Sequence, residues 1–137
     1  MITRTYNATL IQEAVTHFLK SADKVDVIEW LSDPDNIVLI NDNGDLALFE
    51  KGIRHIYTGH YYFKSRGKRA IQAAKDFLDN LFNTCYNISV ITGLAPITNL
   101  GARWLSRQVG FTSHGIVHID DKHYEMFIIT KKEFNAK

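Results

Sequence analysis

The sequence has little of what secreted and membrane proteins carry. Cys85 is its single cysteine, so the chain cannot form an internal disulfide, which agrees with a reducing compartment. No apolar run approaches the roughly 18 consecutive residues of a membrane-spanning helix, and the start, Met1-Ile2-Thr3-Arg4, lacks the apolar core of a signal peptide. We therefore expect a cytoplasmic protein with no membrane as a partner. A nucleophilic role for Cys85 is an alternative, but no histidine stands beside it in the sequence.

An excess of charge of either sign is also missing. Lys and Arg number 16 and Asp and Glu 15, which gives a formal net charge of +1. Such a balance provides no global field to hold nucleic acid or an anionic bilayer. Nucleic-acid binding through the basic residues 64–69 is therefore a minor alternative, and any anion recognition must be local. The histidines are not spaced as metal ligands, so we predict no metal site: His17, His55, His118 and His123.

The composition is that of an ordinary globular protein. The chain has 137 residues, of which 45% are hydrophobic and 23% charged. This length is enough for one sizeable core and not for two. Because the sequence shows no linker, repeat or low-complexity segment, we expect residues 1–137 to form a single domain.

The first part of the chain predicts a strand and two helices. Residues 1–6 alternate apolar and polar side chains, as a short edge strand does. Apolar residues then recur with helical spacing over residues 10–19. A second, short helix fits residues 25–31, between Asp23 as its cap and Pro34.

The next segment predicts three consecutive strands. Two apolar runs, residues 37–40 and 46–49, flank Asn43-Gly44. Such a dipeptide between apolar runs is a strong hairpin signal, because both residues tolerate a positive φ. A third strand is expected over residues 53–63.

The second half predicts helices and strands in alternation. A helix over residues 66–82 presents one apolar face, and the β-branched run at residues 88–94 is typical of a strand buried on both faces. A helix over residues 99–109 ends at Gly110, where helices favour a left-handed glycine. The last two strands are expected at residues 113–119 and 124–129. This order predicts the α/β class, with a central mixed sheet and helices on both faces.

A basic stretch at the start of the first long helix has the pattern of a local anion site. It reads Lys64-Ser65-Arg66-Gly67-Lys68-Arg69-Ala70. A helix N-terminus presents unpaired N–H donors and about half a positive charge to an anion. Gly67 permits close approach of the backbone, and the basic side chains add charged donors. The alternative is a solvated basic helix start in which the glycine has no role.

A second pattern lies along the later helix. It consists of five spaced residues, Asn99, Ala102, Leu105, Gly110 and Phe111. We expect Leu105 and Phe111 to pack in the core, while Asn99 is either a helix cap or a ligand contact. The two patterns, in this order and with a strand between them, resemble the acetyl-CoA-dependent N-acyltransferases of the GNAT superfamily. The resemblance extends over nearly the whole chain and is most specific at residues 60–111.

The resemblance implies a GNAT-like fold and acetyl-CoA as co-substrate. In that family a loop of the pattern Arg/Gln-x-x-Gly-x-Gly/Ala binds the pyrophosphate; here its first position is Lys64, and Arg69 replaces its second glycine. The co-substrate would lie between the strands that contain Tyr61 and Val90. The residues implied to bind it are Tyr61, Arg66, Gly67, Lys68, Arg69, Ala70 and Asn99.

The resemblance also implies how an acetyl group would reach an amine. The family polarises the thioester carbonyl with a backbone N–H of the fourth strand, here within residues 59–62, and carries a tyrosine acid at the position of Ser106. Our candidate catalytic residues are His60 as the base, because imidazole titrates near neutrality, together with Tyr62 and Ser106. The alternative for His60 is a hydrogen-bonded histidine with no catalytic role. Other groups that could replace the acid are Tyr57, Tyr61, His114 and Tyr124.

We therefore expect an N-acetyltransferase that uses acetyl-CoA and an amine acceptor, either a small molecule or a protein. Within the superfamily the chain is similar to small phage-encoded members, of which some are acetyltransferases and others head-assembly proteins of short-tailed phages. The second hypothesis is therefore a weak or inactive GNAT-fold phage protein that acts in head (capsid) assembly in the host cytoplasm. Aromatics such as Trp104 or Tyr57 would then form an interface with phage structural proteins or with further copies of the chain.

Overall fold

The computed structural model describes residues 1–18, 27–84 and 86–136. Two features considered in the sequence, Asp23 as a helix cap and the thiol of Cys85, lie outside these residues. Within the described ranges, no helix is long and apolar enough to cross a membrane.

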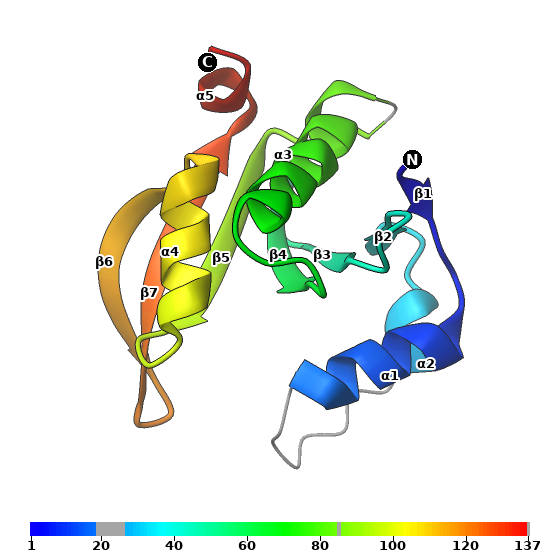
Figure 1. Ribbon diagram of the computed structural model, residues 1–137, viewed down its shortest axis with the longest axis horizontal. Helices are drawn as coiled ribbons and strands as arrows, with labels where there is room; N and C mark the ends of the chain where they lie inside the picture. The colour runs from blue at the N-terminus through cyan, green and yellow to red at the C-terminus, as the bar shows by residue number, and fades with distance from the viewer. Residues whose placement is uncertain (19–26, 85, 137) are drawn as a thin grey trace.

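The centre of the fold is a β-sheet of seven strands. The strands are β1 (Thr3–Arg4), β2 (Ile37–Ile40), β3 (Leu46–Lys51), β4 (Ile56–Tyr62), β5 (Val90–Pro96), β6 (Thr112–Ile119) and β7 (Lys122–Thr130). Their order across the sheet is β1-β2-β3-β4-β5-β7-β6 (Figure 1). The β4–β5 pair is parallel and its neighbours are antiparallel, so the predicted mixed sheet is confirmed.

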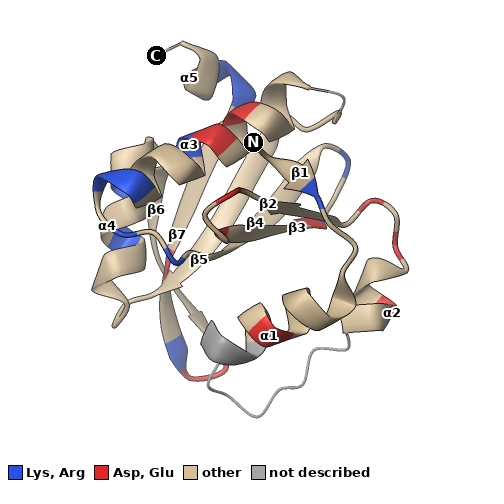
Figure 2. Ribbon diagram, turned by 45° about the vertical axis from the view of Figure 1, so that its right-hand side comes forward, with Lys and Arg blue, Asp and Glu red and all other residues tan. Residues whose placement is uncertain are grey.

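Helices cover both faces of this sheet, as predicted (Figure 2). They are α1 (Ala8–Phe18), α2 (Val27–Leu31), α3 (Lys68–Asn83), α4 (Leu100–Val109) and α5 (Lys131–Asn135). The helices α1 and α2 lie on one face, and α3 and α4 on the other. The prediction lacks α5, although this helix begins at a capping box in which Thr130 and Glu133 bond each other's backbone N–H, both at 3.1 Å.

Alternating side chains along the central strands build two hydrophobic cores. Leu48 of β3 faces α1, where it packs with Ile11 and Val15, whereas its neighbour Phe49 faces α3 and packs with Phe77. Both phenylalanines are fully buried, and each such side chain contributes roughly 1.5–3 kcal/mol relative to an exposed one. The continuous apolar runs of β2 and β3 therefore reflect burial on both faces. The sequence predicts the same burial for the run at residues 88–94, but there Leu94 of β5 is 43% exposed, so that expectation is only partly met.

Most elements begin within three residues of the predicted starts rather than at them, and hydrogen bonds explain two of these shifts. The helix α1 begins at Ala8 rather than two residues later, because the Asn7 side chain caps it by accepting a hydrogen bond from the Leu10 N–H at 3.1 Å. The strand β4 begins at Ile56 rather than at Ile53, because a turn closed by a bond from the Ile56 N–H to the Ile53 carbonyl, 3.1 Å long, precedes it.

The strands β4 and β5 run side by side over a short distance. Their paired residues are Ile56 with Val90, Tyr57 with Ile91, and Thr58 with Thr92. Beyond these pairs β4 stays beside β3 as far as Tyr62, while β5 follows β7 as far as Pro96 (Figure 1). The sheet therefore parts between β4 and β5, and the loop that follows β4 leads directly into the N-terminus of α3.

Candidate functional site

The peptide groups of β4 alternate between its two neighbours. The Ile56 carbonyl accepts a hydrogen bond from the Gly52 N–H at 2.9 Å, on the side of β3. The next carbonyl, that of Tyr57, accepts from the Thr92 hydroxyl of β5 at 3.4 Å. Because successive peptide groups of a strand point to opposite sides, every second residue of β4 after Tyr57 directs its N–H and carbonyl toward β5.

This alternation turns the peptide groups of Gly59 and Tyr61 toward the parting of the strands. The Gly59 carbonyl oxygen lies 3.9 Å from the position that a Cβ atom on Gly93 would take. A Cβ atom on Gly59 would itself come within 2.7 Å of the Tyr61 hydroxyl. Glycine at position 59 thus leaves room for the Tyr61 side chain, and the N–H groups of Gly59 and Tyr61, which point toward β5, are the candidates for the expected polarising donor.

The side chain of Tyr61 packs on the face of β4 that α3 covers. Its ring makes edge contacts with Phe49 and Phe63, with ring centroids 5.8 Å apart in both pairs. The hydroxyl is buried, and within the described part of the chain it has no hydrogen-bond partner. Burial raises the pKa of Tyr61. An unpaired buried hydroxyl costs about 1–3 kcal/mol, so a ligand with a polar atom at this point would offset that cost.

The start of α3, where the sequence predicts an anion site, has no side chain as its cap. Gly67 is the N-cap, with φ 60° and ψ −132°. This conformation is largely restricted to glycine. The first backbone hydrogen bond of the helix runs from the Ile71 N–H to the Gly67 carbonyl at 3.2 Å, so the N–H groups before Ile71 lie at the positive end of the helix. A Cβ atom on Gly67 would meet nothing within 4 Å.

The predicted loop residues surround this helix end. Arg66, Lys68 and Arg69 are exposed, whereas Ala70 is buried in the core beneath them. The guanidinium of Arg66 is turned back onto its own loop, where it donates to the Phe63 carbonyl at 2.6 Å and to the Ser65 carbonyl at 3.0 Å. Two exposed basic residues, Lys68 and Arg69, thus stand in the first turn of the helix, while the guanidinium of Arg66 is engaged with its own loop.

The helix α4 holds the two predicted residues Asn99 and Ser106. Asn99 caps the helix, since its side-chain oxygen accepts from the Ala102 N–H at 3.0 Å, and Gly110 ends the helix with φ 112°. Both caps agree with the sequence pattern. The half-buried Ser106 hydroxyl donates to the Ala102 carbonyl at 2.9 Å, so it is engaged within its own helix. A role of either residue toward a ligand stays a prediction.

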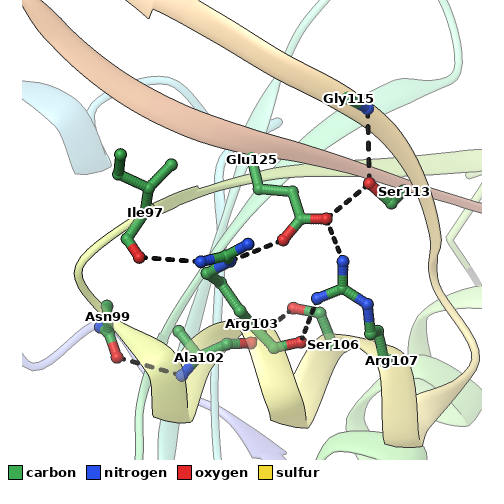
Figure 3. Close-up of polar contacts among 9 residues, drawn as sticks. All are labelled: Ile97, Asn99, Ala102, Arg103, Ser106, Arg107, Ser113, Gly115 and Glu125. Atoms are coloured by element: carbon green, nitrogen blue, oxygen red, sulfur yellow. Dashed lines mark hydrogen bonds and ion pairs between the residues drawn. The ribbon is translucent and has the colours of Figure 1, made fainter.

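An ion-pair cluster around the buried Glu125, which the sequence did not indicate, fixes α4 to the sheet (Figure 3). Glu125 of β7 accepts from Arg103 Nε at 2.8 Å, from the Ser113 hydroxyl at 2.6 Å and from Arg107. Arg103 also donates to the Ile97 carbonyl at 2.9 Å. The bond from Ser113, with those from the two arginines, lowers the pKa of Glu125 to about 2, although burial raises it.

This cluster could not be predicted from local sequence patterns, because Glu125 is far from Arg103 and Arg107 in the chain. The spacing of Arg103 and Arg107 places them on one side of a helix, which is a weak signal for a partner. The sequence around Glu125 does not identify it as that partner, because most of the other residues of β7 are either exposed or apolar. The signal that could have found it is its position: a charged residue on the helix-facing side of a strand must be paired when buried.

His60 and Tyr62 lie on the other face of β4. Tyr62 is buried in the core under α1 and α2, and burial raises the pKa of its hydroxyl. His60 points to the same side, because it stands two residues away in the strand. Its side chain is 47% exposed, with Nε2 at 4.0 Å from the Glu50 carboxylate. Partial burial lowers the pKa of His60 below its usual range, against the opposing effect of Glu50.

The predicted site residues therefore form two groups. Tyr61, the loop before α3 and the helix α4 lie on one face of the sheet, and His60 with Tyr62 on the opposite face. Of the two aromatics considered for an interface, Trp104 is 45% exposed, but Tyr57 is only 8% exposed and lies in the core. Among the described residues, no three His, Cys, Asp or Glu side chains come together as a possible metal site.

No protein-family model and no curated protein matches this sequence. Solved structures match it closely in fold. A chimera of the spermidine N-acetyltransferase SpeG from Vibrio cholerae and hSSAT superposes with a TM-score of 0.75 at 12% identity, over 98% of this chain and 99% of the chimera. The spermidine N-acetyltransferase from Vibrio cholerae, in complex with CoA and spermine, gives 0.72 at 13% identity, over 98% and 97% of the two chains.

A third match is the aminoglycoside acetyltransferase AAC(6')-Ib in complex with coenzyme A and kanamycin. It superposes with a TM-score of 0.71 at 13% identity, over 100% of this chain and 99% of that one. The chain thus has the fold of the GNAT acetyltransferases, as the sequence resemblance implies. At sequence identities this low, the similarity establishes the fold and does not establish the activity.

Proposed function

We propose that this chain is an acetyl-CoA-dependent N-acyltransferase that moves an acetyl group to an amine. The observation that carries the proposal is the open N-terminus of α3 at Gly67, placed beside the parting of β4 and β5 in a GNAT fold. The proteins of similar fold include enzymes solved with CoA and with the amines spermine and kanamycin. We further propose that residues 1–137 act as one domain in the cytoplasm.

Acetyl-CoA fits the arrangement of this site in two places. Its pyrophosphate would sit on the N–H groups that follow Gly67, with Arg66, Lys68 and Arg69 as charged donors; the space beside Gly67 is open. Its thioester arm would run between β4 and β5, past the peptide groups of Gly59 and Tyr61 and toward Asn99.

The transfer itself then needs a donor that polarises the carbonyl, a base for the ammonium and a proton for the thiolate. A backbone N–H of Gly59 or Tyr61 polarises the thioester carbonyl. The base, His60, takes a proton from the acceptor ammonium, and its lowered pKa keeps the imidazole neutral and able to do so near pH 7. The amine nitrogen attacks the carbonyl carbon, the C–N bond forms and the C–S bond breaks. The departing thiolate takes up the second proton lost by the amine, either through Ser106 or Tyr62 or through water.

A second function, assembly of a phage head by a weak or inactive GNAT-fold protein, rests on two residues. Ser106 stands where the family has its tyrosine acid, and Trp104 on the same helix is exposed and suited to an interface. The solved structures of similar fold are named as enzymes and lend this function no support.

A thermal-shift titration with acetyl-CoA tests the proposed function at the level of binding. A ligand that binds the native state stabilises it by about 2.7 kcal/mol at a hundredfold excess over Kd. We expect the midpoint of unfolding to rise with acetyl-CoA concentration. A well-folded protein whose midpoint stays fixed at millimolar acetyl-CoA would exclude the co-substrate and the proposed reaction.

A further inference from the structure

The carboxylate of Asp45 holds the loop that leads from β4 into α3. Its Oδ1 accepts hydrogen bonds from the backbone N–H groups of Lys64, at 2.7 Å, and Ser65, at 2.8 Å. Its Oδ2 accepts from the Ser65 hydroxyl at 2.6 Å and from the Asn41 side-chain amide at 3.1 Å. The residue is fully buried. One side chain from the β2–β3 turn therefore anchors two consecutive amides and a hydroxyl of this loop.

The anchor at Asp45 is itself rigid. The side-chain oxygen of Asn41 accepts from the N–H groups of Asn43 and Asp45, both at 3.0 Å, and Gly44 completes the turn with φ 79°. The hydrogen bonds from Ser65, Asn41 and Lys64 lower the pKa of Asp45 in spite of its burial, which raises it. The loop is thus attached to a turn whose own conformation is fixed by hydrogen bonds.

This attachment lies directly before the start of α3. With the amides of Lys64 and Ser65 turned inward to the carboxylate, the chain reverses direction before Arg66, whose guanidinium then folds back onto the Phe63 carbonyl. Gly67 follows at once as the N-cap. The position of the open helix N-terminus relative to β4 therefore depends on a buried carboxylate that does not belong to the loop.

We propose that Asp45 is a positioning residue for the phosphate-binding loop at the start of α3, and this inference rests on the proposed function. It holds Lys64 and Ser65 so that the N–H groups after Gly67 meet the pyrophosphate of acetyl-CoA in a preformed arrangement. The charge of Asp45 by itself opposes an anion nearby. The effect of removing it therefore distinguishes positioning from simple electrostatics, because the two predict changes of opposite sign in affinity.

The experiment compares two thioesters by calorimetric titration, acetyl-CoA and S-acetylpantetheine, which has the same arm and no phosphate. In Asp45→Asn the side-chain oxygen can still accept from the Lys64 and Ser65 N–H groups, but without its charge, and the amide that replaces Oδ2 faces the amide of Asn41, so the anchor is weakened while the volume is kept. We expect the Kd for acetyl-CoA to rise about tenfold, with the Kd for S-acetylpantetheine unchanged within about twofold. Ser65→Ala, which removes a single bond, should give a smaller change in the same direction and serves if Asp45→Asn does not fold.

A matched control removes a carboxylate elsewhere. Asp35→Asn breaks a surface pair with Lys51, 2.8 Å long, at the opposite end of the β2–β3 hairpin, and should leave both constants unchanged. Tighter binding of acetyl-CoA by Asp45→Asn, or an equal loss for both thioesters, would overturn the positioning role while leaving the proposed function intact. A native protein that binds no acetyl-CoA would overturn the proposed function, and this inference with it.

Discussion

The hydroxyl of Ser106 donates to the carbonyl of Ala102, 2.9 Å away and one turn earlier in α4. An aliphatic hydroxyl held in this way is a poor acid and has little freedom to reach a ligand. The residue that the sequence resemblance aligns with the tyrosine of the GNAT family thus bonds within its own helix. Loss of a general acid lowers a rate by about 10²-fold or more without abolishing it, so we expect slow turnover rather than none.

The first prediction concerns this position. Ser106→Tyr introduces a phenol that could protonate the departing thiolate. It should therefore increase the rate of CoA release, measured with a thiol reagent. Ser106→Ala removes only the hydroxyl and should leave the rate within about twofold of the native value. A tenfold loss in Ser106→Ala would show that the serine acts as the acid after all.

The second prediction concerns the base. His60→Ala should reduce the rate of transfer, because the amine then loses its proton to water. In the native protein the rate should fall as the pH drops through the pKa of His60, which burial places below its usual range near 6.5. At higher pH the imidazole is neutral and the rate should be constant with respect to this group.

Glu50 provides the matched test of that assignment. Its carboxylate raises the pKa of His60, so Glu50→Gln should move the acid limb of the pH–rate profile to still lower pH without removing it. A profile that is the same in native protein, His60→Ala and Glu50→Gln would contradict the role of His60.

The third prediction concerns stability. Breaking a fully buried ion pair by removing one charge costs about 3 kcal/mol or more. Glu125 is buried, but Arg103 and Arg107 are 28% and 47% exposed, so water can partly solvate the charges that Glu125→Gln leaves and the free energy of unfolding should fall by less than that amount. The pKa of Glu125 is about 2 in the fold, against 4.5 for an ordinary glutamate side chain. The carboxylate of Glu125 therefore contributes its full stabilisation at pH values above the pKa of the unfolded state. This stabilisation is lost as the pH falls through the lower pKa of the folded state.

Urea titrations at several pH values measure this contribution. The difference between native protein and Glu125→Gln should be constant above about pH 4.5 and shrink as the pH falls toward about 2. A difference that does not change over this range would mean that the carboxylate is not held in its charged form by Ser113, Arg103 and Arg107.

Much of the fold could be predicted because local patterns determine it. Asn43-Gly44 sets the hairpin, and Asn99 and Gly110 bound α4, as the sequence indicates. The helix spacing at residues 66–82 likewise follows from one buried face. These features depend on residues that are close together in the chain, so a reading of neighbouring residues is enough to find them.

The site could be predicted only in part, because its geometry depends on distant residues. The loop at Gly67 is marked by its own sequence, but the carboxylate that holds it, Asp45, comes from another turn. The parting of β4 and β5 follows from the pairing of β5 with β7. The alternation of β4 puts His60 and Tyr61 on opposite faces, although the two are adjacent in the sequence.

The fourth prediction concerns the phosphate end of the site. Gly67→Trp should weaken acetyl-CoA binding by more than tenfold, because the side chain would fill the open space beside the helix N-terminus. Gly115→Trp is the matched control: this glycine also has a positive φ, 96°, and open space around its Cβ position, but lies in β6. Equal Kd values for the two variants in calorimetry would show that the pyrophosphate binds elsewhere.

The most direct test is a search for the product. The protein is incubated with acetyl-CoA and a panel of amines that includes spermine, kanamycin and lysine-containing peptides, and the mixtures are analysed by mass spectrometry. We expect at least one N-acetylated amine, formed in equal molar amount with CoA and absent with Gly67→Trp. Tight binding of acetyl-CoA without any acetylated amine, even with Ser106→Tyr, would contradict the proposed acetyl transfer and leave the protein as a binding module.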